Sequence, residues 1–176
     1  EAERAAHELG SFDLEYLEQP CATVPELADL RARLHDWDLP IAADESVRKA
    51  DDPLAVARAG AADILVLKAQ PLGGVSAALR IAAEAGLPVV VSSALDTSVG
   101  VSMEAHLAAA LPELEFDCGL GTAALLAADV TEDPLVPHEG AIPVRRVEVV
   151  PGREASAERV TWWTERLVRC AELLVE

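Results

Sequence analysis

Five polar side chains recur along this chain at a nearly constant interval, and each follows a short apolar run. They are Glu18, Asp44, Lys68, Ser92 and Asp117, separated by 26, 24, 24 and 25 residues. One β-strand with its following helix takes about 30 residues or slightly fewer. The interval therefore predicts about five strand–helix units, which would form a parallel sheet with right-handed crossovers.

The apolar composition fits such an α/β fold. Hydrophobic residues make up 51% of the chain and aromatic residues only 3%, so we expect an aliphatic core between helices and sheet. Five units are too few to close an eight-stranded barrel, and an open doubly wound sheet remains an alternative. Because no glycine-rich loop follows the first expected strand, a nucleotide-binding version of that sheet is disfavoured.

Helical and strand patterns alternate from the start of the chain to about residue 122. Thr23 and Glu26 have the spacing of a capping box at the start of one helix. Gly10, Gly60 and Gly86 are expected to end three others. The expected helices cover 1–10, 23–35, 52–59, 75–85 and 98–110, and the expected strands cover 14–17, 40–43, 63–68, 88–91 and 114–116.

The repeat ends after residue 122, so we expect a division between residues 1–130 and a C-terminal part, 131–176. A short helix is expected at 123–128, a return strand at the sheet edge at 144–150 and an amphipathic closing helix at 155–176. The closing helix has an apolar stripe at helical spacing, which we interpret as core packing. The stripe consists of Trp162, Trp163, Leu167, Cys170 and Leu174.

Charge and cysteine content restrict the partners and the compartment. The net charge of −17 would repel nucleic acid and anionic lipid, so neither is expected as a partner. No apolar run approaches the ~20 residues of a membrane span. Three scattered cysteines predict a reducing, cytoplasmic location. Because the chain starts at Glu1 within a helical pattern, we expect it to be part of a longer polypeptide.

Lys68 ends an unbroken aliphatic run, where an unpaired ammonium would be costly to bury. The carboxyl ends of parallel strands build the functional site in α/β folds. We therefore expect Lys68 to point into a polar site, where it would transfer a proton or hold a positive charge against an enolate. A lysine that extends to solvent is the alternative.

Two carboxylates are expected at the same end of the sheet. Glu18 and Asp44 would repel each other there unless a proton or cation lies between them. A hard divalent ion with oxygen ligands, usually Mg²⁺, would remove that repulsion. Each carboxylate could instead cap a helix or pair with a nearby base. Glu45 is expected to face away from the ion and to support Lys68 as its partner.

Small polar residues follow the later strands. Ser92 and Ser93 offer hydroxyl groups, and the turn containing Gly119 and Gly121 offers backbone amides. Such groups suit the carboxylate of a small-molecule substrate, so these four residues are candidates for substrate binding. Serine and glycine are also ordinary turn residues, which is the simpler alternative.

Three of these strand ends together resemble those of the enolase superfamily, in its muconate-cycloisomerase-like branch. The matching strings are YLEQP at 16–20, ADES at 43–46 and LK at 67–68. Longer strings resemble the actinobacterial o-succinylbenzoate synthase family within that branch. They are EQPC at 18–21, DESVR at 44–48 and SSALDTSVG at 92–100. The resemblance extends over the whole chain.

The resemblance implies that residues 1–130 are the C-terminal part of a parallel (β/α)₇β barrel, to which a capping domain is attached. It also implies Mg²⁺, or Mn²⁺, held by three carboxylates, of which Glu18 is the second and Asp44 the third. Lys68 would face an enediolate. The implied reaction is the syn dehydration of 2-succinyl-6-hydroxy-2,4-cyclohexadiene-1-carboxylate to o-succinylbenzoate, a step toward menaquinone.

The chain departs from the family pattern at its start. The first metal-binding Asp and a Lys-x-Lys strand of the pattern should precede Glu1, so the N-terminal half of the polypeptide is an expected partner. We therefore expect the isolated chain to bind Mg²⁺ poorly and to be inactive. The alternatives are an N-succinylamino acid racemase or dipeptide epimerase, an aldolase with Lys68 as Schiff base, and a non-catalytic half-barrel interaction module.

Overall fold

The computed structural model describes residues 1–49, 51–153 and 155–173. Its centre is a four-stranded parallel sheet in the order β1-β2-β3-β4, so neighbouring strands follow one another along the chain. This order confirms the predicted strand–helix repeat. The strands are β1 (Leu17–Glu18), β2 (Ile41–Ala43), β3 (Ile64–Leu67) and β4 (Val89–Val91).

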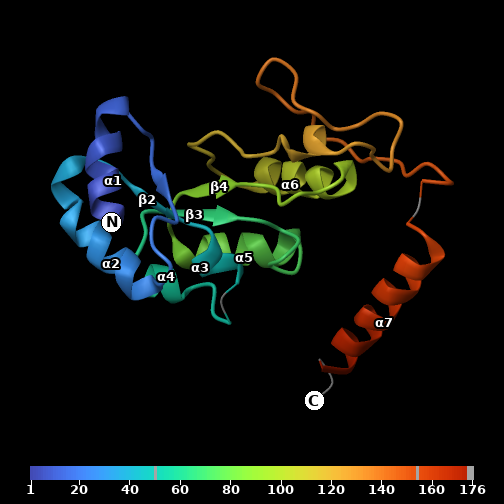
Figure 1. Cartoon of the computed structure of the whole chain (residues 1–176), viewed down its shortest axis with the longest axis horizontal. Coiled ribbons are helices and arrows are strands. Elements are labelled where there is room, and N and C mark those ends of the chain that lie inside the picture. The colour runs from blue at the N-terminus through green and yellow to red at the C-terminus, as the bar shows by residue number, and fades with distance from the viewer. Residues whose placement is uncertain (50, 154, 174–176) are drawn as a thin grey trace.

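Helices connect the strands and surround the sheet. Figure 1 shows α1 and α2 near the β1 edge, and α5 and α6 near the β4 edge. The helices are α1 (Ala2–Leu9), α2 (Val24–Arg33), α3 (Glu45–Arg48), α4 (Ala55–Arg58), α5 (Val75–Ala85), α6 (Ser98–Ala110) and α7 (Ala157–Leu173). Short 3-10 turns lie at Gly10–Phe12, His35–Trp37 and Thr122–Leu125.

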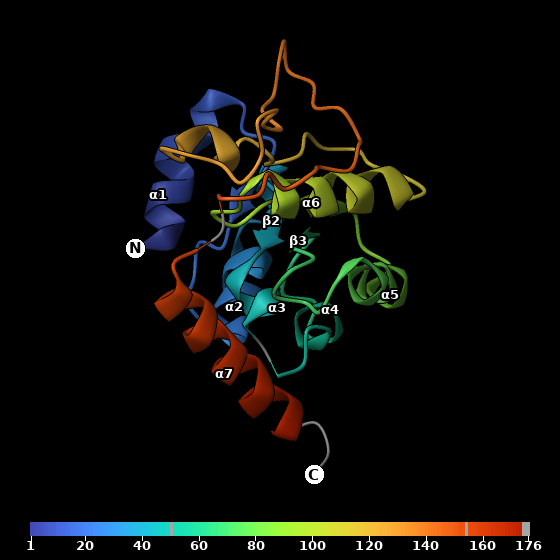
Figure 2. The ribbon, with the colours of Figure 1, turned by 90° about the vertical axis from the view of Figure 1, so that its right-hand side faces the viewer.

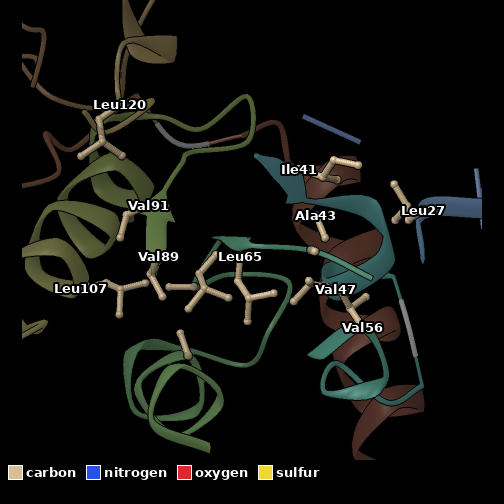
Figure 3. Close-up of a cluster of buried hydrophobic side chains, with 14 of the residues drawn as sticks. Leu27, Ile41, Ala43, Val47, Val56, Leu65, Val89, Val91, Leu107 and Leu120 are labelled. Carbon is tan, nitrogen blue, oxygen red and sulfur yellow. The ribbon is translucent and has the colours of Figure 1, made fainter. Parts of the chain in front are cut away.

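Alternate strand residues face two separate apolar clusters. Ile41, Leu65 and Val91 belong to the large cluster that includes side chains of the surrounding helices (Figure 3). The residues between them face the other side of the sheet, where Tyr16 and Phe116 cover a smaller cluster. The smaller cluster consists of Ala42, Ile64, Val66 and Val90. Helices on one face and a narrow aliphatic layer on the other are typical of a (β/α) barrel wall.

Local sequence signals fix several element ends as predicted. The Thr23 hydroxyl accepts a hydrogen bond from the Glu26 amide, and the Glu26 carboxylate accepts one from the Thr23 amide, which completes the capping box of α2. Gly86 ends α5 with a φ of 63°, in the left-handed region that glycine adopts without strain. The predicted bounds of α5 and α6 agree with the structure.

Other element ends differ from the prediction. The first strand is Leu17–Glu18 rather than 14–17, and the helix expected at 52–59 forms only over Ala55–Arg58 because the Asp52 carboxylate holds a turn at Leu54. Gly10 keeps a right-handed φ of −59°, and the chain turns at Asp13 instead. The short helix α3 was not predicted.

The expected fifth strand at 114–116 is wrong. In its place, a single parallel bridge joins Ser92 to Gly119, three residues further along. The Gly119 amide donates to the Val91 carbonyl at 2.9 Å, and the Ser93 amide donates to the Gly119 carbonyl at 2.9 Å. The backbone pairing beside β4 therefore lies at Gly119, whereas the predicted strand was to end before Asp117.

Residues 144–150 do not form the expected edge strand. Their backbone contacts go to loops and side chains, since the Val150 amide donates to the Val130 carbonyl and the Arg145 carbonyl accepts from the Ser102 hydroxyl. The short helix expected at 123–128 is a 3-10 turn at Thr122–Leu125. The division of the chain near residue 130 stays a prediction.

Helix α7 forms, but its apolar stripe does not pack on the core. The helix has no buried residue, and Trp163 and Leu167 are 53% and 70% exposed. Figure 1 shows α7 standing apart from the sheet, and in Figure 2 it runs along the lower side of the molecule. Trp162 packs edge-to-face on Trp163, with ring centroids 4.7 Å apart. The predicted core packing of the stripe is therefore wrong for this structure, and Leu174 lies outside the described residues.

Candidate active site

The alternation of strand side chains decides which residues face the inner side of the sheet. Lys68 follows Ile64 and Val66 at two-residue spacing, and Asp44 follows Ala42 in the same way. Successive side chains of a strand point to opposite faces. Asp44 and Lys68 therefore leave the carboxyl ends of β2 and β3 on the side of the smaller cluster.

Lys68 and Asp44 form a buried ion pair at this end of the sheet. The Lys68 Nζ atom lies 2.5 Å from Asp44 Oδ2, and the two residues are only 8% and 3% exposed. The second carboxylate oxygen of Asp44 accepts a hydrogen bond from Arg48 Nε at 2.9 Å. An ammonium buried to this degree requires a counter-charge, which Asp44 provides.

Glu18 lies on the neighbouring strand and is coupled to this pair through its charge. It is the last residue of β1, in register with Ala42 of β2. Desolvation raises the pKa of the Glu18 carboxyl above its ordinary value, and the negative charge of Asp44 raises it further, while Lys68 opposes the rise. The structure thus brings together the three strand-end residues expected to form the site.

Gln19 connects the ends of β1 and β2. This role of Gln19 was not predicted from the sequence. Its side-chain oxygen accepts hydrogen bonds from the amides of Asp44 at 3.0 Å and Ser46 at 3.2 Å. Its Nε2 donates to the Ser46 hydroxyl at 2.7 Å. Gln19 has a φ of 41°, a left-handed backbone conformation that aims this side chain across to the next strand. It therefore fixes the backbone from which Asp44 extends.

Glu45 does not support Lys68 as expected. Its carboxylate pairs with Arg48, three residues along the same helix. Glu45 begins α3 one residue after Asp44, so its side chain leaves the backbone in another direction. Arg48 thus bridges Asp44 and Glu45, and the partner of Lys68 is Asp44.

The candidate substrate-binding residues are partly used by the fold itself. The Ser93 hydroxyl donates to the Gly119 carbonyl at 3.0 Å and lies 2.8 Å from the Thr122 hydroxyl. A Cβ atom at Gly119 would lie 2.8 Å from Ser92 Oγ, so the serine side chain would have to rotate or the two segments would have to move apart. The Gly119 amide, expected to be free, donates to the Val91 carbonyl. Gly121 has ordinary space around it, since a Cβ atom there would lie 3.8 Å from Pro137.

The described residues fit part of a hard-cation site. Glu18 and Asp44 carry the oxygen ligands that Mg²⁺ prefers. However, both oxygens of Asp44 already accept hydrogen bonds, from Arg48 and Lys68. Within residues 1–49, 51–153 and 155–173, no group of three His, Cys, Asp or Glu side chains is arranged to hold a metal. The chain therefore offers two carboxylates toward a site rather than a full ligand set.

Comparison with known proteins decides the family. A family model described as enolase C-terminal domain-like matches residues 1–152. The chain belongs to this family. The enolase C-terminal-like fold agrees with the parallel sheet order, with the helix-covered outer face and with the strand-end cluster of Glu18, Asp44 and Lys68.

Curated relatives of this enolase C-terminal-like chain are named o-succinylbenzoate synthase. The protein of Thermobifida fusca is 62% identical over 150 residues, which cover 85% of this chain and 46% of the relative. The protein of Mycobacterium ulcerans is 55% identical over 165 residues, covering 92% and 49%. The chain thus spans about half the length of the curated relatives it matches.

Solved structures of the same superfamily share the fold. Muconate cycloisomerase from Pseudomonas fluorescens superimposes with a TM-score of 0.72 at 30% identity, covering 92% of this chain and 45% of that protein. A probable mandelate racemase from Alicyclobacillus acidocaldarius superimposes with a TM-score of 0.66 at 32% identity, covering 82% of this chain and 39% of that protein.

In the described part of the chain, no helix is both long and apolar enough to cross a membrane.

Proposed function

We propose that this chain is the barrel portion of an o-succinylbenzoate synthase. The observation that carries the proposal is the 62% and 55% identity to curated proteins of that name. The reaction would remove water from 2-succinyl-6-hydroxy-2,4-cyclohexadiene-1-carboxylate: a proton leaves the carbon beside the carboxylate, a hydroxyl leaves the next carbon, and an aromatic ring forms. The reaction is a step toward menaquinone, and a cytoplasmic location is part of the proposal.

Lys68 would stabilise the charge that develops during this reaction. Loss of the proton beside a carboxylate places additional negative charge on the substrate, and a fixed ammonium next to that charge lowers its free energy. One well-placed group of this kind is typically worth about 3 kcal/mol. The buried contact with Asp44 supports this role, because it holds the ammonium at one position before substrate arrives.

Glu18 and Asp44 would contribute oxygen ligands for Mg²⁺, with Mn²⁺ as the alternative ion. When bound, the ion would neutralise negative charge on the substrate carboxylate. Ser92, Ser93, Gly119 and Gly121 border the neighbouring strand end and would contact the succinyl part of the substrate. The pairing of Ser93 with Thr122 supports a preformed wall at this position.

The isolated chain would be inactive, because its site has two of the three metal-binding carboxylates and one of the two catalytic lysines of the family pattern. The remaining groups would come from a segment equivalent to the unmatched part of the curated relatives. The match to only 46% of the Thermobifida fusca relative supports this. The sheet edge at β1 also supports it, because within the described residues β1 is hydrogen-bonded to no strand other than β2.

The test is a dehydration assay that follows the diene absorbance as the ring becomes aromatic. The chain is assayed alone and together with the remaining part of the Thermobifida fusca relative, with and without Mg²⁺. Mg²⁺-dependent turnover only in the combined sample supports the proposal. Full turnover by the chain alone would contradict its incompleteness, and a combined sample that binds but does not dehydrate would contradict the synthase assignment.

An N-succinylamino acid racemase or dipeptide epimerase is the second candidate. Solved structures named for other reactions share the fold at 30% and 32% identity, so the fold alone does not separate this candidate from the synthase. Such enzymes would exchange the α-proton of an N-succinylamino acid or dipeptide with solvent. Deuterium exchange into these substrates that is faster than dehydration would favour this candidate.

A further inference from the structure

Glu104 is a fully buried carboxylate outside the cluster described above. It lies in the middle of α6 and has an exposed fraction of 0%. Both of its oxygens accept hydrogen bonds from the backbone amide of Ala69, at 2.8 and 3.0 Å. Ala69 directly follows Lys68, so a side chain of α6 holds the backbone at the end of β3.

The segment after β3 requires such an acceptor. The chain leaves the sheet at this point and turns, with the Gly74 amide donating to the Ala69 carbonyl at 2.7 Å. The Ala69 amide is buried, and a buried amide without an acceptor destabilises the fold. The Gln70 amide lies close enough to lower the pKa of the Glu104 carboxyl. One carboxylate thus holds the backbone immediately after the lysine.

Two charged side chains face Glu104 from neighbouring elements. Lys68 approaches from the end of β3, and Asp96 approaches from the loop before α6. Asp96 is itself buried and accepts a hydrogen bond from the Ala94 amide at 2.9 Å. Burying a glutamate side chain is costly unless hydrogen bonds offset the loss of hydration. The hydrogen bonds of Glu104 therefore contribute to its place in the fold.

We propose that Glu104 is a positioning residue for Lys68: by binding the Ala69 amide with both carboxylate oxygens, it fixes the direction in which the lysine side chain leaves β3. Its importance for catalysis rests on the proposed function, whereas its effect on Lys68 does not. Without this anchor the turn after Leu67 could rotate, and the ammonium would leave its 2.5 Å contact with Asp44. A misplacement of about 1 Å can reduce an enzyme's rate ~100-fold.

Ionisation of Glu104 offers a direct readout of this contact. Burial raises the pKa of its carboxyl to about 7, although the Ala69 and Gln70 amides and Lys68 oppose the rise and Asp96 adds to it. The hydrogen bonds from the Ala69 amide therefore change strength near neutral pH. If Glu104 positions the lysine, the Lys68 signals should follow the same titration.

The experiment is an NMR titration of the whole chain labelled with ¹⁵N and with ¹³C-lysine. The chain contains two lysines, so exposed Lys49 is an internal reference for Lys68. The wild type is compared with E104Q, which keeps one acceptor oxygen, and with E104A, which keeps none. The control E84Q removes the same charge at an exposed position of α5.

We expect the amides of Ala69 and Gln70 and the ¹³Cε signal of Lys68 to shift together with a midpoint near pH 7 in wild type and E84Q. In E104Q this titration should be absent, while the ¹³Cε signal of Lys68 should keep its wild-type chemical shift. In E104A the ¹³Cε signal of Lys68 should be displaced. When the chain is combined with the remaining part of the Thermobifida fusca relative, E104A should lower kcat by up to ~100-fold. E104Q should retain most of the wild-type kcat. A Lys68 signal unaffected in both variants would overturn the proposal, even if dehydration is never detected. If E104A does not fold, loss or persistence of the titration in E104Q still decides.

Discussion

Asp44 is the residue on which the burial of Lys68 depends. Removing one partner of a buried ion pair leaves an uncompensated charge, which typically costs about 3 kcal/mol or more. We predict that D44N lowers the free energy of unfolding by ~3 kcal/mol in urea denaturation. The matched control is D29N, which breaks the exposed pair with Arg33 and should cost about 0–1 kcal/mol. Equal losses in the two variants would contradict a buried pair.

Glu104 should make stability depend on pH. Its pKa in the folded chain, about 7, lies above its ordinary value of 4.5, so the folded state binds the proton more tightly. The free energy of unfolding should therefore fall as pH rises from about 4.5 to 7, by on the order of 3 kcal/mol for this group. E104Q should gain stability relative to wild type over this interval, measured by urea denaturation at several pH values. E84Q should not, and a wild-type slope retained by E104Q would contradict the assignment.

At the residue scale, position along a strand could be predicted better than pairing. The near-constant interval between strand ends placed Glu18, Asp44 and Lys68 together from the sequence, because the carboxyl ends of parallel strands lie at one edge of the sheet. The partners of Glu45 and Glu104 could not be predicted in this way. They depend on how α3 and α6 lie against the sheet, and no local pattern encodes that placement.

Among the helices, α2 offers a direct test of a local signal. T23A removes the hydroxyl that accepts the Glu26 amide and should lower the free energy of unfolding by about 1 kcal/mol. Thr97 also precedes a helix, but its side chain makes no capping hydrogen bond among the described residues. T97A should therefore have a smaller effect in the same denaturation experiment, and a larger effect of T97A would contradict this account.

The bridge between Ser92 and Gly119 gives a second test at the scale of elements. In G119A the new methyl group would lie 2.8 Å from Ser92 Oγ, so the serine side chain must rotate or the two segments must move apart. We predict a loss of about 1–3 kcal/mol in thermal unfolding. G121A is the control, since its methyl group would meet only an ordinary contact with Pro137 at 3.8 Å. A loss in G119A no larger than in G121A would contradict a close contact between Ser92 and Gly119.

Element prediction was most accurate for two apolar helices. The bounds of α5, which ends at Gly86, and of α6 were predicted correctly. The segments at 114–116 and 144–150 have strand-like composition only. Whether such segments form strands depends on a neighbour with free backbone groups, and here the bonds go to Gly119 and to loops.

The whole molecule has a half-barrel character that its composition did not reveal. Four parallel strands with one helix-covered face and a small inner cluster form a curved wall. Helix α7, which was expected to close the core, stands apart from the sheet (Figure 1), and its apolar side chains are exposed. Amphipathic spacing predicts that a face will be covered, but it does not state which surface covers it.

The measurement that tests the central claim most directly compares the two lysine variants in the dehydration assay. The claim is that the strand-end amine of Lys68 acts on the substrate, so K68A in the combined enzyme should lower kcat by at least ~100-fold. K49A removes the other lysine, which is exposed, and should leave kcat unchanged. Equal rates for K68A and K49A, with both proteins folded, would contradict the claim.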